Sequence, residues 1–248
     1  MQKSEKHVLI LGCGRSGTSI FGEFFEHLPA YTYYSEPPFK QLRTINYASP
    51  VAIKVPKESP GFPPSPGLPF PLEDVLRLLP EPRQVYWQVR NPLDTICSLR
   101  VGISKNWGHH PQPPDWQEWL SRPLLERCAH HWNYINSTGY AQVAHWVKVT
   151  RFEDMIHNPL VFAHSICEDV GIDEKAYETS IQQWAQRVQN TNNAHFVEAQ
   201  TSRPYSRPDH QVRVGRWKEN LREEEVNSIL PIMQETAAKF GYEIKKIF

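Results

Sequence analysis

The feature that most constrains the fold is an apolar strand that runs directly into a glycine-rich turn and an amphipathic helix. Residues 7–11 read His-Val-Leu-Ile-Leu, and the turn that follows contains Gly12, Gly14 and Gly17. Apolar residues then recur at helical spacing between 18 and 28. The backbone N–H groups of such a turn and the amino end of its helix together form a cradle for an anion. The sequence therefore predicts a strand, an anion-binding turn and a helix.

This turn differs from the phosphate loop of nucleoside triphosphatases. In the pattern G-x-x-x-x-G-K-[ST], Gly12 and Gly17 fit, Ser19 fills the hydroxyl position and Thr18 replaces the lysine. The positive charge lies inside the loop instead, at Arg15. Glycine-rich turns also occur as simple tight connections, but the arginine and the hydroxyl residues favour an anion site.

A second predicted strand, 84–89, ends in Arg90-Asn91-Pro92. A kinase of this type needs an aspartate near the end of a second strand to hold Mg²⁺. Arginines at both strand ends instead favour a multiply charged anion that is handled without a metal.

Two motifs in this order resemble those of sulfotransferases that use 3′-phosphoadenosine 5′-phosphosulfate (PAPS) as donor. Residues 14–19 (Gly-Arg-Ser-Gly-Thr-Ser) resemble the 5′-phosphosulfate loop of that family. Arg90, followed eight residues later by Ser98, resembles its 3′-phosphate motif. Later segments, 151–154 (Arg-Phe-Glu-Asp) and 212–218, also resemble family motifs, so the likeness spans most of the chain.

The resemblance implies PAPS as donor, adenosine 3′,5′-bisphosphate (PAP) as product and no metal. It places Phe152 near the adenine and the segment from Arg213 to Arg216 at the 3′-phosphate. The donor-binding residues that it implies are Gly14, Arg15, Ser16, Gly17, Thr18, Ser19, Arg90, Ser98, Phe152, Arg213, Gly215 and Arg216.

The same comparison points to Glu36 as the catalytic base. Glu36-Pro37 is similar to the Glu-Pro of carbohydrate 6-O-sulfotransferases, at the same distance after the loop arginine. Cytosolic aryl and steroid sulfotransferases use a histidine two residues after a strand-end lysine, whereas here Val55-Pro56 follow Lys54. The resemblance implies that Arg15 and Lys54 stabilise charge on the sulfuryl group and the leaving phosphate. From the residues alone, a helix-capping or salt-bridging role for Glu36 and an exposed position for Lys54 remain alternatives.

Composition bounds the class of protein and its partners. A chain of 248 residues suits one α/β domain, 1–248. Lysine plus arginine and aspartate plus glutamate number 27 each, which does not favour nucleic acid as partner. There is no apolar run long enough to span a membrane and no secretory signal, so we expect a cytoplasmic enzyme, either monomer or homodimer. The expected acceptor is a small molecule or carbohydrate that offers a hydroxyl, with an amine or carbamate nitrogen also compatible.

The cysteines and histidines do not suggest other chemistry. The widely spaced cysteines are expected to be reduced thiols, and Cys13 is interpreted as a small residue in a tight loop rather than a nucleophile. The adjacent pairs His109-His110 and His130-His131 lack further ligands at metal spacing.

The rest of the chain alternates between strand and helix patterns, which predicts a parallel sheet with helices on both faces. A Pro-rich surface loop is expected near 56–71, and a donor-covering lid near 190–216. The segment 105–116 either lines the acceptor pocket or packs a loop onto the body. The other predicted elements are strands at 51–53 and 145–150 and helices from Pro92 and at 115–137, 159–170, 173–189 and 223–239.

Two other functions remain compatible with the sequence. One is a small-molecule kinase that uses ATP and Mg²⁺, against which Thr18 and Arg90 argue. The other is a donor-binding module without turnover, against which the joint presence of Arg15, Glu36 and Lys54 argues.

Overall fold

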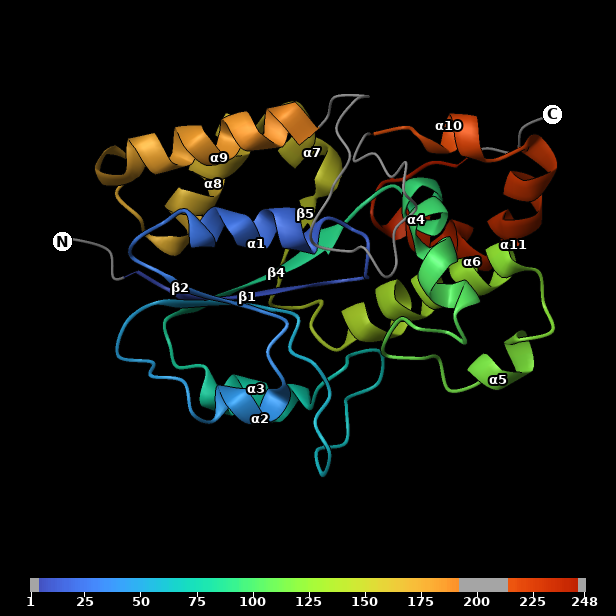
Figure 1. The fold of residues 1–248 in the computed structure, drawn as a ribbon, viewed down its shortest axis with the longest axis horizontal. Helices are drawn as coiled ribbons and strands as arrows, with labels where there is room; N and C mark the ends of the chain where they lie inside the picture. Colours follow the sequence, from blue (N-terminus) through green and yellow to red (C-terminus); the bar gives the residue numbers. More distant parts are fainter. Residues whose placement is uncertain (1–4, 192–213, 245–248) are drawn as a thin grey trace.

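The computed structural model describes residues 5–191 and 214–244, with the side chains of 189–191 left out, so the predicted Arg213 and most of the predicted lid lie outside it. At its centre is a five-stranded sheet with strand order β2-β3-β1-β4-β5 (Figure 1). All neighbouring strands pair in parallel, which confirms the predicted fold class. The strands are β1 His7–Gly12, β2 Thr32–Ser35, β3 Val51–Lys54, β4 Arg83–Val89 and β5 Lys148–Arg151.

Helices cover both faces of this sheet. In Figure 1, α1, α8 and α9 lie above the strands, α2 and α3 lie below, and α4, α6 and α11 gather beside the carboxyl ends of β1 and β4. Their bounds are α1 Thr18–Glu26, α2 Phe39–Leu42, α3 Leu72–Leu78, α4 Pro92–Ser104, α5 Trp116–Trp119, α6 Leu124–Tyr134, α7 Phe152–His157, α8 Pro159–Val170, α9 Glu178–Thr191, α10 Trp217–Asn220 and α11 Glu223–Lys239. A π-helical turn, η1 Ile135–Gly139, extends α6, and a 3₁₀ turn, η2 Glu174–Tyr177, precedes α9.

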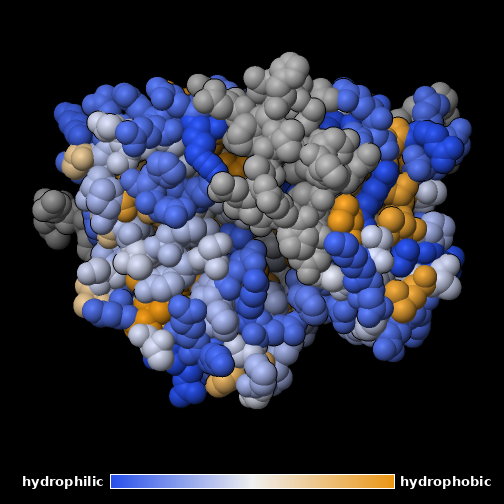
Figure 2. Space-filling model, in the orientation of Figure 1, coloured by the Kyte–Doolittle hydropathy of each residue, from blue (hydrophilic) through white to orange (hydrophobic). Residues whose placement is uncertain are grey.

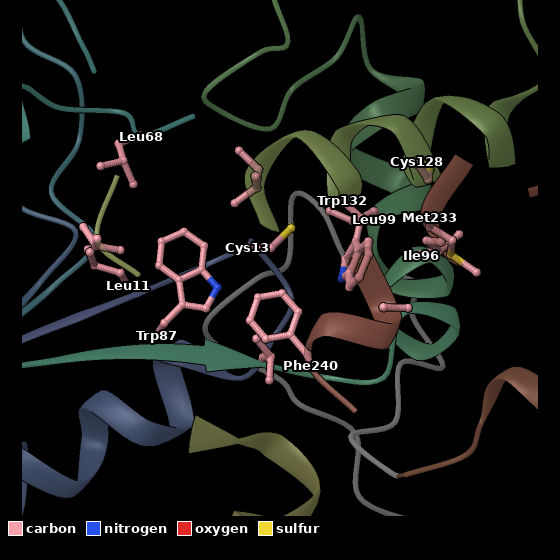
Figure 3. Packing of buried hydrophobic residues seen from close by; sticks show 14 of the residues in the cluster. Leu11, Cys13, Leu68, Trp87, Ile96, Leu99, Cys128, Trp132, Met233 and Phe240 are labelled. Carbon is pink, nitrogen blue, oxygen red and sulfur yellow. The ribbon is translucent and has the colours of Figure 1, made fainter. Parts of the chain in front are cut away.

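Alternation along the strands divides the core into two parts. Val8 and Ile10 of β1 pack with the buried faces of α1, α8 and α9. Leu9 and Leu11 point to the opposite face, where they join a cluster that includes Trp87 and reaches α4, α6 and α11 (Figure 3). Burial of each such large side chain contributes about 1.5–3 kcal/mol. The two clusters cover the two faces of the sheet, so a site can form only at an edge, where the strands end.

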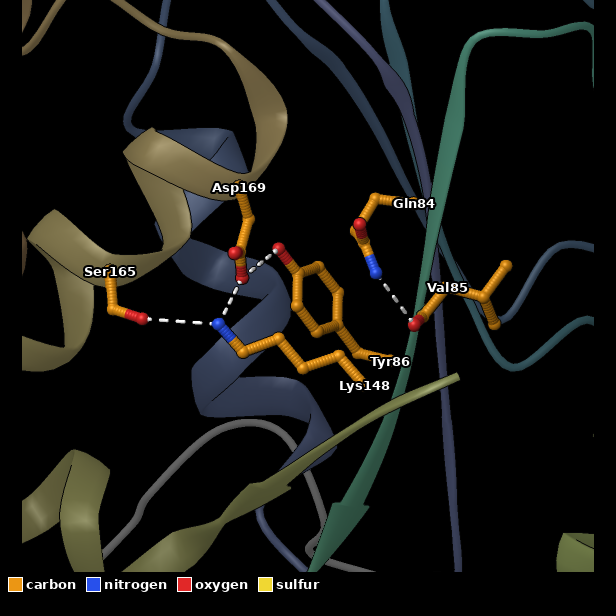
Figure 4. Close-up of polar contacts among 6 residues, drawn as sticks. All are labelled: Gln84, Val85, Tyr86, Lys148, Ser165 and Asp169. Atoms are coloured by element: carbon orange, nitrogen blue, oxygen red, sulfur yellow. Dashed lines mark hydrogen bonds and ion pairs between the residues drawn. The ribbon is translucent and has the colours of Figure 1, made fainter. Parts of the chain in front are cut away.

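Polar contacts also attach the helices to the sheet. Lys148 of β5 and the Tyr86 hydroxyl of β4 both reach the carboxylate of Asp169 on α8, at 2.6 and 3.2 Å (Figure 4).

The face in Figure 2 is mainly hydrophilic, with scattered apolar residues. Within the described ranges, no helix is long and apolar enough to cross a bilayer.

Several boundaries agree with the sequence prediction. α1 begins at Thr18, and α4 begins at Pro92, where the Asn91 side chain accepts a hydrogen bond from the Leu93 N–H at 3.0 Å. α8 and α11 have the predicted bounds, 159–170 and 223–239. In these segments local pattern and capping residues coincide, and tertiary contacts do not override them.

Three predicted elements were wrong in part. The single helix expected at 115–137 is broken, because Pro123 has an extended backbone and the chain can start α6 only after it. The strand expected at 145–150 begins at Lys148, since the residues before it form a turn. The helix expected at 173–189 starts as a 3₁₀ turn, and α9 proper begins at Glu178. The short strand β2 was not predicted, and neither were α2, α3, α7 and α10.

Candidate active site

The glycine-rich turn joins β1 to α1 at the carboxyl edge of the sheet. Gly12 and Gly17 have φ values of 147° and 87°, which favour glycine. A Cβ on Gly17 would lie 2.3 Å from the Phe152 ring, so this position also requires the absence of a side chain. Arg15 itself has a positive φ of 71°, a strained conformation that is often found at functional sites.

The turn presents the groups that an anion needs. α1 starts immediately after it, and the first N–H groups of a helix have no partner within the helix. The Ser16 hydroxyl is buried and makes no hydrogen bond within the part of the chain that the structure describes. Buried hydroxyls are nearly always hydrogen-bonded, so this group fits a bound oxyanion.

Lys54 and Glu36 meet directly beside this turn. The Lys54 ammonium donates to the Ser19 hydroxyl at 2.9 Å and to Glu36 Oε1 at 2.7 Å. The other carboxylate oxygen of Glu36 lies 2.9 Å from the Lys57 ammonium. Glu36 has a φ of 51°, and its backbone N–H bonds to the Lys54 carbonyl at 2.9 Å, which brings the ends of β2 and β3 together. Lys54 is thus a buried site residue, and Glu36 is its partner.

The charges around Glu36 control its acidity. Partial burial tends to raise its pKa, but the two lysines outweigh this effect and lower the pKa to about 2. The carboxylate is therefore ionised at all ordinary pH values. While both lysines remain paired with it, the carboxylate is a weak base.

A second polar group forms at the amino end of α4. Arg90 is buried, its guanidinium lies 4.3 Å from the centre of the Phe152 ring, and it donates to the Arg15 carbonyl at 3.4 Å. Ser98 is also buried, two turns into α4, and its hydroxyl donates to the Asp94 carbonyl at 3.1 Å. These contacts place the predicted 3′-phosphate motif next to the glycine-rich turn.

The carboxy-terminal segment joins this group through Asp94. The backbone N–H groups of Gly215 and Trp217 donate to the two Asp94 carboxylate oxygens, at 2.8 and 2.9 Å. Arg216 lies between them and is buried. Both Arg216 and Arg90 are near enough to Cys97 for their charges to affect its pKa, which burial raises to about 11. Arg90 and Arg216 therefore face the same region of α4.

A pocket of about 920 Å³ adjoins the turn, and Gly14, Arg15 and Thr18 of the turn are among its lining residues. Arg15, Ser19, Glu36 and Lys54 line one wall of it. The remaining wall comes largely from the segments 67–70 and 108–111 and from apolar core residues. Those residues are Gly67, Leu68, Pro69, Phe70, Gly108, His109, His110, Pro111, Leu11, Trp87 and Ile135.

The segment 105–116 contributes one residue to the core and another to the pocket, and whether that pocket binds the acceptor stays a prediction. Trp107 is fully buried and packs in the core, whereas His109 lines the pocket. Burial, the nearby Arg15 and His110 lower the pKa of His109 to about 4, so its imidazole is neutral near neutral pH. The ring lies against α4, where a Cβ on Gly102 would be 2.2 Å from His109 Nε2.

Thiol and metal chemistry find no support among the described residues. All four cysteines are free and buried, and burial raises the pKa of Cys13 far above its usual value, so the thiol in the turn is not a nucleophile. No group of three or more potential ligands stands close enough to hold a metal within the described ranges.

The predicted residues thus fall into two adjoining groups. The turn 14–19 and Lys54 with Glu36 form the first, and Arg90, Ser98, Gly215 and Arg216 form the second. Phe152 is buried between Gly17 and Arg90, so its predicted stacking on adenine stays a prediction.

Sequence reasoning missed two residues that the structure brings to the site, Lys57 and Asp94, and it did not single out a third, His109. Lys57 had no signal, because it resembles any exposed lysine of a Pro-rich loop. Asp94 had a weak one, its place in the first turn of the helix after Arg90. His109 was included only within the segment 105–116, for which a place in the pocket wall was one of two alternatives.

Comparisons with known proteins identify the family and the fold. The sulfotransferase domain family matches residues 5–241, although no curated protein matches the sequence. Mouse sulfotransferase SULT7A1, solved with PAP, superposes with a TM-score of 0.60 at 15% identity, over 95% of this chain and 85% of that one. A retinol dehydratase solved with androsterone and PAP gives a TM-score of 0.54 at 15% identity, over 96% and 82% of the two chains. The sulfotransferase domain of the Synechococcus PCC 7002 olefin synthase gives 0.53 at 12% identity, over 99% and 98%. The chain belongs to the sulfotransferase domain family, as its motifs predicted.

Proposed function

We propose that this enzyme transfers the sulfuryl group of PAPS directly to a nucleophile bound in the 920 Å³ pocket. The observation that carries the proposal is the Lys54–Glu36 pair. It contacts Ser19 of the anion-binding turn on one side and opens into the pocket on the other. A proton acceptor and a cation thus stand where the donor and the acceptor would meet.

The donor is assigned from the two groups of polar residues. The turn 14–19 and the amino end of α1 would hold the 5′-phosphosulfate, and Arg90, Ser98, Gly215 and Arg216 would hold the 3′-phosphate. Two separate anion sites suit a nucleotide with phosphate groups at both positions better than they suit ATP. The PAP found in the mouse sulfotransferase and the retinol dehydratase structures supports this choice.

In the proposed reaction, the acceptor oxygen attacks sulfur in line while the bond from sulfur to the bridging oxygen of the 5′-phosphate breaks. PAP leaves with the electron pair of that bond, and the acceptor proton passes to Glu36. Arg15 and Lys54 stabilise the negative charge that develops on the sulfuryl and phosphate oxygens. They supply the charge stabilisation that Mg²⁺ provides in kinases.

The low pKa of Glu36 adds a condition to this mechanism. While Glu36 is paired with Lys54 at 2.7 Å, its carboxylate is a weak base. A 5′-phosphosulfate in the turn would compete for the Lys54 ammonium, which already contacts Ser19 there. Donor binding would thereby release Glu36 and raise its pKa, so the base becomes effective only when the donor is in place.

The proposed acceptor is a small molecule or a carbohydrate that offers a hydroxyl. The pocket volume lies within the range of small-molecule sites, and its wall combines apolar with charged residues. Androsterone in the retinol dehydratase complex is an acceptor-sized ligand of this type. An amine or carbamate nitrogen would fit the same arrangement. The four free thiols suit a reducing compartment, and the cytoplasm is our proposed location.

Calorimetric binding and thermal stabilisation with PAP, measured against ATP plus Mg²⁺, test the donor assignment. We expect PAP to bind without metal and to stabilise the fold, and ATP plus Mg²⁺ to have little effect. Preference for ATP plus Mg²⁺ would establish a kinase instead. A subsequent screen of phenol, sterol and sugar acceptors with PAPS tests turnover, and PAP binding without turnover of any acceptor would favour a silent donor-binding module.

A further inference from the structure

Asp94 is a carboxylate at an unexpected position. It lies in the first turn of α4, four residues after Arg90, and it is completely buried. The charges of Arg90, Arg216 and Asp94 all act on the neighbouring Cys97, so the three groups share one small region. A negative charge in this region opposes the binding of a phosphate. Its presence calls for a compensating role.

The contacts of Asp94 indicate that role. Each carboxylate oxygen accepts a backbone N–H, from Gly215 at 2.8 Å and from Trp217 at 2.9 Å. These donors lie more than a hundred residues further along the chain, and they flank Arg216. Hydrogen bonds from a backbone N–H to a carboxylate are stronger than those between neutral groups. Asp94 therefore fixes the backbone of 215–217 against α4 through the chain's own groups.

The conformation of Gly215 supports this interpretation. Its φ is 81°, a conformation that side chains rarely adopt, and no described residue would lie within 4 Å of a Cβ there. Glycine is therefore required for the backbone conformation. The turn at 215 directs two N–H groups onto one carboxylate, and in doing so it places the Arg216 side chain.

We propose that Asp94 is a positioning residue that makes the site selective for a 3′-phosphate. By holding 215–217 at the amino end of α4, it keeps Gly215 and Arg216 close to Arg90 and Ser98. The inference rests on the proposed PAPS donor. It adds a residue that does not itself touch the nucleotide and whose charge has the wrong sign for direct binding.

The negative charge of Asp94 allows a positioning role to be distinguished from a purely electrostatic one. If Asp94 acted only through its charge, Asp94→Asn would remove a repulsive group and the 3′-phosphate would bind more tightly. If Asp94 acts by positioning, the asparagine amide keeps one acceptor and loses the other. The segment 215–217 is then released, and 3′-phosphate binding becomes weaker. The two interpretations predict effects of opposite direction.

The experiment compares the affinities of PAP and of AMP, which lacks only the 3′-phosphate, for the wild-type chain and for Asp94→Asn by calorimetry. We expect PAP to bind about tenfold or more weakly to the variant, which corresponds to the loss of one charged hydrogen bond. The affinity for AMP should change by less than about twofold, which is no more than a typical surface substitution causes. Tighter or unchanged PAP binding, or an equal loss for both ligands, overturns the proposal.

A matched control is Asp169→Asn. Asp169 also accepts from two partners, the Tyr86 hydroxyl and Lys148, but it lies on α8 away from both anion sites (Figure 4). This variant should keep the wild-type preference for PAP over AMP. A loss of preference in the control as well would mean that general destabilisation, and not positioning, explains the result.

The outcomes also separate this inference from the proposed function. If the wild-type chain does not prefer PAP to AMP, the PAPS donor assignment fails, and the inference fails with it. If it prefers PAP and Asp94→Asn keeps that preference, only the role of Asp94 is wrong. If Asp94→Asn does not fold, amide hydrogen exchange of the unliganded wild-type chain decides. Protection at Gly215 and Trp217 is expected, and fast exchange at both would overturn the proposal.

Discussion

The two carboxylates of the site are held in opposite ways. Glu36 is partly exposed, at 40% of its side chain, and it is held by the side-chain charges of Lys54 and Lys57. Asp94 has no exposed surface and is held by two backbone N–H groups. Side-chain ammonium groups can turn toward another anion, whereas backbone groups cannot do so without moving the chain. The surroundings of Glu36 are thus adjustable by a ligand, whereas those of Asp94 are built into the fold.

The largest effect that tests this difference between Glu36 and Asp94 is expected from removing the charge of Glu36. If Glu36 is the adjustable base, Glu36→Gln should lower turnover by about 10²- to 10⁴-fold, because proton transfer loses its acceptor. PAP affinity should change little. Steady-state kinetics with an acceptor from the screen, together with calorimetry, measure the two effects.

A matched variant for this test is Glu58→Gln, which removes another carboxylate of the same pocket, paired with His110 at 3.3 Å. Its turnover should remain within a few-fold of wild type. A fully active Glu36→Gln enzyme would remove Glu36 from the mechanism.

The adjustable character of Glu36 can be tested by its titration. Its pKa of about 2 means that the ionised form stabilises the fold above the ordinary pKa of 4.5, and that this contribution is lost as the pH falls toward 2. In Lys54→Met the loss should occur at higher pH, nearer the ordinary value. Carboxyl NMR titration or unfolding as a function of pH measures the shift.

Lys57→Met serves as the comparison, because the Lys57 side chain is 61% exposed and its charge is better screened by water. It should raise the pKa of Glu36 less than Lys54→Met does. Equal pKa values in wild type and Lys54→Met would show that the ion pair does not control Glu36.

A smaller effect concerns His109, the neutral group across the pocket. The pKa of about 4 predicts that this imidazole stays uncharged from about pH 8 down to about pH 5. Burial and Arg15 lower the pKa, His110 lowers it further, and Glu36 acts in the opposite direction. His131, fully buried with its ring centre 5.8 Å away, packs behind it.

Histidine ring NMR on the unliganded chain checks this titration, with Arg15→Gln as the variant that should raise the pKa. Titration of His109 near its ordinary value of 6.5 in the wild-type chain would contradict the description of the pocket wall.

The smallest expected effect tests how α4 accommodates His109. Gly102→Ala alone should destabilise the chain by about 1–3 kcal/mol, because the methyl group would overlap the His109 ring. In a His109→Ala background the same change should stabilise it by about 1 kcal/mol, through better helix propensity. Denaturant unfolding of the wild type, the two single variants and the double variant gives the coupling free energy between Gly102 and His109. Equal effects in both backgrounds would mean that the ring does not occupy this space.

Local sequence patterns predicted the glycine-rich turn and the start of α4 well, and physical reasons explain what they did not predict. The glycine-rich turn and the start of α4 are written in consecutive residues, so they were visible in the sequence. Asp94 was not, because its partners are backbone N–H groups of Gly215 and Trp217, which no side-chain motif encodes. The break in the predicted helix 115–137 was encoded by Pro123, but its apolar spacing continued through the proline.

The pocket wall was the least predictable part. Two consecutive residues with positive φ, Asn106 and Trp107, precede the segment that brings His109 to the pocket. Neither residue is a glycine, which would have indicated such a turn in the sequence. Lys57 reaches Glu36 only because an isolated bridge joins Lys57 to Pro38. These placements result from packing over long sequence distances, which periodicity does not report.

The close approach of Gly67 to Gly139 bears on how such an enzyme could acquire new acceptors. A Cβ on Gly139 would lie 2.4 Å from the Gly67 carbonyl, and the Gly67 N–H bonds to the Tyr134 hydroxyl at 2.9 Å. The Pro-rich loop is therefore fastened at this point, while the stretch between Lys57 and Gly67 forms no regular structure apart from an isolated bridge. Glu58 and Gly67 line the pocket at the two ends of that stretch, whereas the residues between them do not. Insertions or exchanges there would therefore act on the pocket wall through these two ends and leave the sheet and both anion sites intact. Evolution and engineering thus have one interchangeable segment to vary, with Gly67 as its fixed end.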